Sequence, residues 1–200
     1  MSGNEVVHLI DDDEDVRRAL AFLLGTAGLA VKVYESALLF LEKYDGSPSG
    51  CIVSDVRMPG MDGLQLLKHL KQTGVKLPVV ILTGHADVAL AVEAMKTGAV
   101  DFIEKPFSDE VLLSAIRSAL QRRAGNHASG DVEQIRARMA SLTPREREVL
   151  DGLLKGHPNK TIAYDLGLSP RTVEVHRANV MSKMAASSLS ELVRMALSAG

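Results

Sequence analysis

The sequence predicts an α/β domain with a doubly wound, five-stranded parallel sheet, followed by a separate all-α domain. Over residues 1–123, short β-branched runs alternate with longer stretches whose apolar residues repeat at helical spacing, which is typical of such sheets. From Leu142 onward only helical patterns appear. Charge divides the chain similarly, because residues 1–123 carry 13 Lys/Arg against 17 Asp/Glu and residues 142–200 carry 8 against 6. We therefore expect two domains with different partners.

Five β-branched runs predict the strands of the first domain, and we expect the strand order 2-1-3-4-5. The runs are Val6–Ile10, Ala30–Tyr34, Cys51–Ser54, Val79–Leu82 and Val100–Glu104. Between them, apolar residues recur every three or four positions, which predicts helices, and Gly28 is expected to cap the first. The recurring residues are Val16, Leu20, Leu23 and Ala27; Leu64, Leu67 and Leu70; Val88, Val92 and Met95; and Val111, Ala115 and Ala119.

Residues 124–141 are predicted to link the domains, because RRAGNHASGD is rich in turn-forming residues, and the following VEQIRARMASL predicts a short helix. Four short helices are expected in residues 142–200. Their boundary signals are a Thr143–Glu146 capping box, Gly167 after a helix over about Lys160–Leu166, Ser169 with Pro170 before a helix that reaches about Met184, and Ser188 or Ser190 before the last helix.

No apolar stretch approaches the roughly 20 residues that a membrane span needs, and the N-terminus lacks the pattern of a signal peptide. The single Cys51 lies in an apolar run, and we interpret it as a core residue in a reducing compartment. We therefore expect a cytoplasmic protein with no membrane partner.

Carboxylates follow the first and third predicted strands. Asp11 and Asp12 come directly after the first strand, and Asp55 follows the third. These strands are neighbours in the expected order, so their carboxyl ends bring the three side chains together. Carboxylates at close range repel unless a hard cation lies among them, and Mg²⁺ prefers such oxygens and bridges to phosphate. The sequence therefore predicts a Mg²⁺ site where one carboxylate attacks a phosphoryl group.

Two further polar residues end the remaining strands of this edge. Thr83 follows the fourth strand, where its hydroxyl is placed to donate to a phosphoryl oxygen. Lys105 follows the fifth, where its ammonium is placed to pair with another. Together with Mg²⁺, these groups would supply the charge neutralisation that phosphoryl transfer requires.

Four motifs, IDDD at 10–13, DVRMPGMDG at 55–63, TG at 83–84 and DFIEKPF at 101–107, resemble the flavodoxin-like receiver domain of two-component response regulators. The resemblance implies that Asp55 accepts a phosphoryl group from a sensor histidine kinase. The receiver itself would catalyse this transfer and a slow self-dephosphorylation. The implied Mg²⁺ ligands are Asp11, Asp12, Asp55 and the backbone carbonyl of Arg57, with Asp12 the more direct ligand of the acidic pair. A cis Lys105–Pro106 bond is also implied.

The same resemblance implies a relay in which Thr83 moves toward the phosphoryl group and Phe102 turns inward behind it. An alternative for Phe102 is an ordinary core aromatic. We hypothesise that Val92 and Lys96, four residues apart on one helical face, form a phosphorylation-dependent homodimer. Arg57 and His85, each two residues past a site residue, are expected to tune the lifetime of the phosphoryl group.

The predicted helices on either side of Gly167 form a helix-turn-helix arrangement, whose second helix enters the major groove of double-stranded DNA. Val173, Val180 and Met184 recur at helical spacing and are expected to face the core. The residues expected to face the bases are Glu174, Val175, Ala178 and Asn179. The expected phosphate contacts are Lys160, Arg171, Thr172, His176, Arg177 and Lys183, with a core position as the alternative for His176.

LTPREREVL at 142–150 and NKTIAYDLGLSPRTVEVHRANVMSKM at 159–184 resemble the LuxR/FixJ-type response regulators. The resemblance implies a promoter-binding regulator that activates nitrogen-fixation genes and meets RNA polymerase there. The amphipathic last helix is expected to pair two such domains, or else to cover only its own core.

Two other functions share single features with this sequence. A Mg²⁺-dependent aspartyl phosphohydrolase would use Asp55 as nucleophile, but Arg57 stands where dehalogenase-type phosphatases carry a second Asp, and turnover of p-nitrophenyl phosphate would discriminate the two. An RNA-binding module is disfavoured because the chain has neither RNP-type aromatics nor a Gly-x-x-Gly loop.

Overall fold

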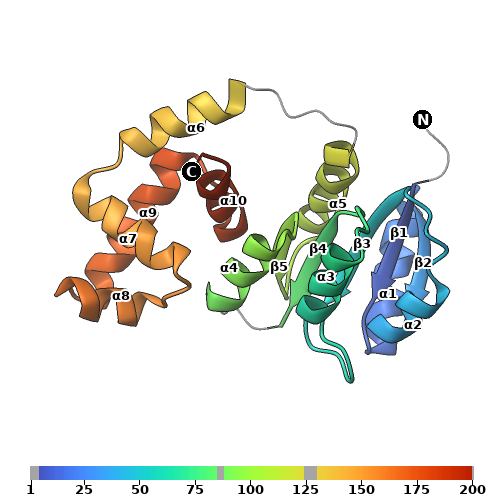
Figure 1. Cartoon of the computed structure of the whole chain (residues 1–200). Coiled ribbons are helices and arrows are strands. Elements are labelled where there is room, and N and C mark those ends of the chain that lie inside the picture. Colours follow the sequence, from blue (N-terminus) through green and yellow to red (C-terminus); the bar gives the residue numbers. More distant parts are fainter. Residues whose placement is uncertain (1–4, 85–87, 124–129, 200) are drawn as a thin grey trace. The chain divides into compact units, whose positions relative to one another are not determined.

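The computed structural model describes residues 5–84, 88–123 and 130–199. Its single sheet contains five parallel strands in the order β2-β1-β3-β4-β5, so the predicted fold class and strand order are confirmed (Figure 1). The strands are β1 Val6–Ile10, β2 Ala30–Tyr34, β3 Gly50–Asp55, β4 Val79–Thr83 and β5 Asp101–Glu104. The fifth strand begins one residue later than predicted, although the Val100 N–H already donates to the Val79 carbonyl at 2.7 Å.

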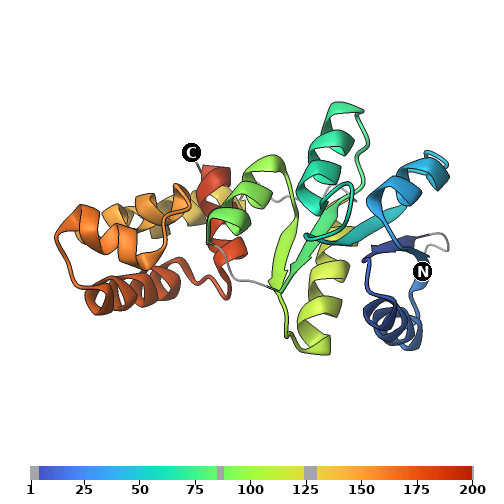
Figure 2. The same ribbon diagram turned by 90° about the horizontal axis from the view of Figure 1, so that it is seen from below.

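Helices alternate with the strands. They are α1 Glu14–Thr26, α2 Ala37–Lys43, α3 Gly63–Gln72, α4 Val88–Thr97 and α5 Asp109–Arg123. On one face of the sheet, α1 and α5 pack against the strands, while α2 and α3 cover the other face (Figure 2). The seven-residue α2 begins after Ser36, whose hydroxyl accepts from the Leu39 N–H. With both faces covered, every residue of β3 and β4 is buried, as parallel strands require.

The helical part of the chain contains α6 Gly130–Ala140, α7 Pro144–Leu154, α8 Asn159–Leu166, α9 Pro170–Met184 and α10 Leu189–Ala199. The Thr143–Glu146 capping box of α7, the left-handed Gly167 after α8 and the Ser169 cap of α9 are all present as predicted. The last helix begins after Ser188, whose hydroxyl accepts from the Glu191 N–H at 3.1 Å. These helices share one apolar core, to which α6 contributes Ile135.

Contacts divide the chain into two compact units, residues 1–85 with 97–126 and residues 86–96 with 127–200. This division places α6, which the sequence assigned to the linker, in the helical unit, together with α4. The domain boundaries expected from the sequence, 1–123 and 142–200, stay a prediction. None of the helices in the described ranges is long and apolar enough to cross a bilayer.

Candidate functional site

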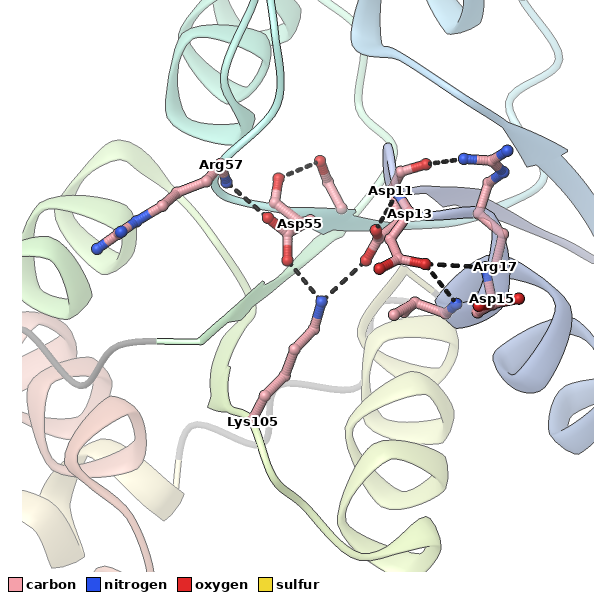
Figure 3. A network of polar contacts seen from close by, with 9 residues as sticks. Asp11, Asp13, Asp15, Arg17, Asp55, Arg57 and Lys105 are labelled. Carbon is pink, nitrogen blue, oxygen red and sulfur yellow. Dashed lines mark hydrogen bonds and ion pairs between the residues drawn. The ribbon is translucent and has the colours of Figure 1, made fainter.

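The carboxyl ends of β1, β3 and β5 bring two carboxylates and one ammonium together (Figure 3). Asp11 and Asp55 are buried, with 2% and 8% of their surfaces exposed. The Nζ of Lys105 lies 2.6 Å from Oδ1 of Asp55 and 2.9 Å from Oδ2 of Asp11. The predicted convergence of strand-end residues therefore holds for these three.

The charge of Lys105 is fixed by this arrangement. Burial alone would lower the pKa of its ammonium, but the hydrogen bonds and negative charges of Asp55 and Asp11 outweigh burial, and the net pKa is raised. The side chain is therefore a cation at neutral pH. It offsets the repulsion between two buried carboxylates that lie against the same nitrogen.

Asp55 is held from its backbone side as well. The Arg57 N–H donates to Oδ2 of Asp55 at 2.6 Å, and the Ser54 hydroxyl donates to the Asp55 carbonyl at 2.9 Å. Gly63 passes so close that a Cβ there would lie 2.3 Å from the same carbonyl oxygen. The Arg57 side chain is exposed and extends away from the carboxylate (Figure 3). The loop after β3 thus orients Asp55 through its backbone, and Gly63 is required for that approach.

The consecutive acidic residues after β1 make different contacts. Asp11 accepts from the Asp13 N–H at 3.0 Å, and the Asp11 carbonyl accepts from the Arg17 guanidinium at 2.7 Å. Asp13 caps α1 by accepting from the N–H groups of Asp15 and Val16. Asp12 is exposed. The structure thus places the buried Asp11 beside Asp55, whereas the assignment of Asp12 as the more direct Mg²⁺ ligand stays a prediction. Arg17 is a supporting residue that the sequence did not indicate.

The other predicted receiver residues lie on neighbouring elements. Thr83 ends β4 and is fully buried, and its carbonyl accepts from the Lys105 N–H at 2.6 Å. Phe102 lies on β5 opposite Ile81 and is partly buried. The Lys105–Pro106 bond is cis, as expected. His85 lies outside the described residues.

The two residues of the hypothesised dimer face differ in exposure. Lys96 is exposed on α4, whereas Val92 retains only 3% of its surface. The dimer hypothesis therefore requires Val92 to become accessible.

The donor set at this edge has the chemistry of a hard-cation site. The ligands expected there are all oxygens: the carboxylates of Asp11, Asp12 and Asp55 and the backbone carbonyl of Arg57. Within the described ranges, no three acidic, histidine or cysteine side chains converge closely enough to bind a metal by themselves. Mg²⁺ keeps several waters and needs only one or two carboxylates, so the residues fit this ion.

The helix-turn-helix presents one face of α9 outward. Val173, Val180 and Met184 are fully buried, as predicted. The four residues predicted to face bases are all exposed: Glu174, Val175, Ala178 and Asn179. Gly167 adopts φ 65°, which lets the chain turn sharply between α8 and α9. This geometry matches a helix that enters the major groove by its N-terminal part.

The predicted phosphate contacts are in different environments. Lys160 and Arg171 are exposed, and the Arg171 guanidinium lies 3.4 Å from Glu174. Arg177 is partly buried and reaches Asn159 at 3.4 Å, while the Nδ1 of His176 is buried with no partner among the described residues. The remaining two already have partners: the Thr172 hydroxyl lies 2.8 Å from that of Ser169, and Lys183 pairs with Glu146.

Two family models match the chain. The response regulator receiver domain matches residues 7–117, and the bacterial regulatory proteins of the luxR family match residues 140–196. The chain belongs to the response regulators, with a receiver domain followed by a LuxR-type DNA-binding domain. It is a phosphorylation-dependent transcriptional regulator rather than a conventional enzyme. The receiver implies a sensor kinase as partner, and the LuxR-type domain implies DNA.

Within this family the chain is similar over nearly its whole length to the transcriptional regulatory protein FixJ. It is 57% identical to FixJ of Azorhizobium caulinodans over 97% of this chain and 92% of that protein. It is 53% identical to FixJ of Rhizobium meliloti over 97% and 96% of the two chains. The crystal structure of full-length FixJ from B. japonicum is 52% identical over 98% of both chains, with a TM-score of 0.58.

Proposed function

We propose that Asp55 takes the phosphoryl group from a phosphohistidine of the kinase. A carboxylate oxygen of Asp55 forms a bond to phosphorus as the phosphorus–nitrogen bond of the phosphohistidine breaks. The bonding electron pair stays on that nitrogen, and the ring, which already carries a proton on its other nitrogen, leaves as neutral imidazole. The single observation that supports this most is the Lys105 ammonium, 2.6 Å from Asp55 Oδ1, which stands ready to neutralise charge on the transferred oxygens. Thr83, at the end of β4, is the second donor.

Asp11, Asp12, Asp55 and the backbone carbonyl of Arg57 would hold Mg²⁺, with Asp12 the more direct ligand of the acidic pair. When bound, the ion would neutralise negative charge on the phosphoryl oxygens. Two residues of the chain hold Asp55 in place: the Arg57 N–H donates a hydrogen bond to its carboxylate, and the Lys105 ammonium forms an ion pair with it. With these groups the receiver promotes its own phosphorylation and a slow hydrolysis, whose rate Arg57 and His85 tune.

Phosphorylation then changes the DNA-binding state. Thr83 and Phe102 respond to the new charge, and two receivers associate through the face of α4 that carries Val92 and Lys96. A two-fold dimer would place two copies of α9 on two half-sites of promoter DNA. Glu174, Val175, Ala178 and Asn179 face the bases, and the exposed Lys160 and Arg171 contact phosphates.

The similarity to FixJ supports a role as a cytoplasmic activator that meets RNA polymerase at nitrogen-fixation promoters. Promoter occupancy and transcript levels, measured in cells with the wild-type gene and with Asp55→Asn, test this role. We expect both to rise with phosphorylation for the wild type only. Transcripts that fall as occupancy rises would make the protein a repressor.

A further inference from the structure

Side chains of two other helices, α6 and α7, contact the C-terminal end of the recognition helix α9. The Nζ of Lys183 lies 2.6 Å from Oε2 of Glu146, at the start of α7, and 3.5 Å from the Ser141 carbonyl. The Arg138 guanidinium, on α6, donates to the Met184 carbonyl at 3.1 Å. Met184 ends α9, so this carbonyl is one of the four that lack a partner within the helix. We refer to Arg138, Glu146 and Lys183 as the C-terminal clamp.

Glu146 is the buried member of the clamp. Its side chain is 5% exposed, against 37% for Lys183. The same carboxylate accepts from the Thr143 N–H at 2.8 Å, and the hydrogen bond from Lys183 is the main reason that the pKa of Glu146 is lowered. A buried carboxylate is costly without partners, so the Lys183 ammonium is held where it is by Glu146.

The backbone just after α9 is strained. Ala185 has φ 54°, a left-handed conformation that favours glycine, and it is the one non-glycine residue with positive φ in the part of the chain that the structure describes. Strained backbone of this kind persists where its surroundings determine it. The contacts of the clamp at Lys183 and at the Met184 carbonyl, directly before Ala185, supply such surroundings.

We propose that Arg138, Glu146 and Lys183 are positioning residues that fix the direction of α9 in the DNA groove. Lys183 acts through Glu146 and not through a DNA phosphate. This inference rests on the proposed DNA-binding function of α9. It also gives α6, the helix that precedes the LuxR-type domain, a specific role: through Arg138 it fixes the far end of the helix whose other end meets the bases.

The two roles of Lys183 differ in a measurable way. A phosphate contact contributes to affinity for any sequence, and its loss lowers the slope of log affinity against log salt by about one. A positioning residue contacts no DNA phosphate. Its loss misplaces the base-facing residues, so binding to the specific site weakens while the salt slope and the non-specific binding stay. Substitution of Glu146 distinguishes the two roles further. Removing a negative charge near DNA favours binding on electrostatic grounds alone, whereas loss of a positioning residue weakens it.

The test uses the full chain at a fixed phosphorylation state, with a duplex selected by this protein from random DNA and a scrambled duplex of equal length. Lys183→Met and Glu146→Gln are each expected to weaken binding to the selected duplex about tenfold, with binding to the scrambled duplex within about twofold of wild type. Lys160→Met is the matched control, because Lys160 is exposed and has no partner among the described residues; it is expected to lower the salt slope on both duplexes.

The proposal is overturned by a Lys183→Met protein whose salt slope falls as in Lys160→Met, or by a Glu146→Gln protein that binds the selected duplex at least as tightly as wild type. Thermal unfolding separates positioning from loss of fold. Lys183→Arg, which keeps the charge, is expected to restore the selectivity for the selected duplex. The double variant Lys183→Met/Glu146→Gln, which leaves no unpaired carboxylate, is expected to lose less than the product of the two single losses.

Equal losses on both duplexes, together with a lowered melting temperature in all these variants, would also contradict the proposal. The proposed phosphorylation switch is decided separately. Its failure would appear as equal binding by phosphorylated and unphosphorylated wild type, and the comparison of variants would keep its meaning.

Discussion

Lys105 reaches from the end of β5 to Asp55 on β3, with its Nζ 2.6 Å from the carboxylate Oδ1. The two residues are 50 positions apart in the sequence. The pKa of Lys105 is raised because its carboxylate partners outweigh burial, so its contribution to stability is present at neutral pH and is lost only as the pH rises through that raised pKa, above 10.5. The cation is therefore in place before a phosphoryl donor arrives.

Lys105→Met is predicted to slow phosphorylation by acetyl phosphate about 100-fold, because it removes a donor from the oxygens on which charge develops. The rate is followed by intact-protein mass spectrometry at saturating Mg²⁺. Lys76→Met serves as the control, since Lys76 is exposed and has no partner among the described residues. A Lys105→Met protein phosphorylated as fast as this control would remove Lys105 from the mechanism.

Gly63→Ala is predicted to destabilise the receiver by about 1–3 kcal/mol, because the added Cβ would lie 2.3 Å from the Asp55 carbonyl oxygen and must displace backbone. Gly25→Ala, in α1, has nothing within 4 Å of its added Cβ and is predicted to stabilise the protein by about 0.5–1 kcal/mol. Urea unfolding of both variants measures the difference. Equal free energies of unfolding for the two variants would mean that the loop after β3 can shift to accommodate the added Cβ at little cost.

The sequence predicts the location of a residue best where the periodicity of its element and the order of the strands determine its neighbours. Strands ending at the same edge brought Asp11, Asp55 and Lys105 together, and helical spacing placed Val173 in the core and Asn179 outside. These inferences need only the periodicity of each element and the order of the strands.

Contacts between side chains on different elements could not be predicted in this way. Spacing assigns a side chain to a face but does not say which group it meets there. The pairing of Lys183, a predicted phosphate contact, with Glu146, 37 residues earlier, is therefore not apparent from the sequence. The contact between Arg17 and the Asp11 carbonyl was missed for the same reason.

His8 is predicted to make stability depend on pH. Burial and the nearby Lys32 lower the pKa of His8 below 6.5, with Asp45 opposing them; its Nδ1 lies 3.0 Å from the Tyr34 hydroxyl and its buried Nε2 has no partner among the described residues. Below pH 6.5 the unfolded chain binds a proton that the folded chain resists. Stability therefore falls as the pH drops below 6.5, by at most about 1.4 kcal/mol per pH unit for this group.

Urea unfolding between pH 7.5 and 5 checks this dependence. His8→Phe is expected to flatten the fall relative to wild type, and His69→Gln, on α3, controls for the removal of another imidazole. A His8→Phe protein that loses stability as steeply as wild type would show that other groups carry the dependence.

Lys96→Glu is predicted to abolish phosphorylation-dependent dimerisation without unfolding the protein, because Lys96 is exposed on α4. Val92→Asp tests the same face less cleanly, since Val92 is 3% exposed and a buried carboxylate also costs stability. Sedimentation of both variants with and without phosphorylation is the measurement. Normal dimers of Lys96→Glu would place the interface elsewhere.

The phosphoryl group on Asp55 is expected to control dimerisation and DNA binding. The most direct test measures DNA affinity and oligomeric state together, with and without acetyl phosphate and Mg²⁺, for wild type and Asp55→Asn. A Mg²⁺-dependent gain in dimer and in DNA affinity that Asp55→Asn lacks is the predicted result. Equal binding and equal oligomeric state in all conditions would contradict the claim and leave a DNA-binding protein that its receiver does not control.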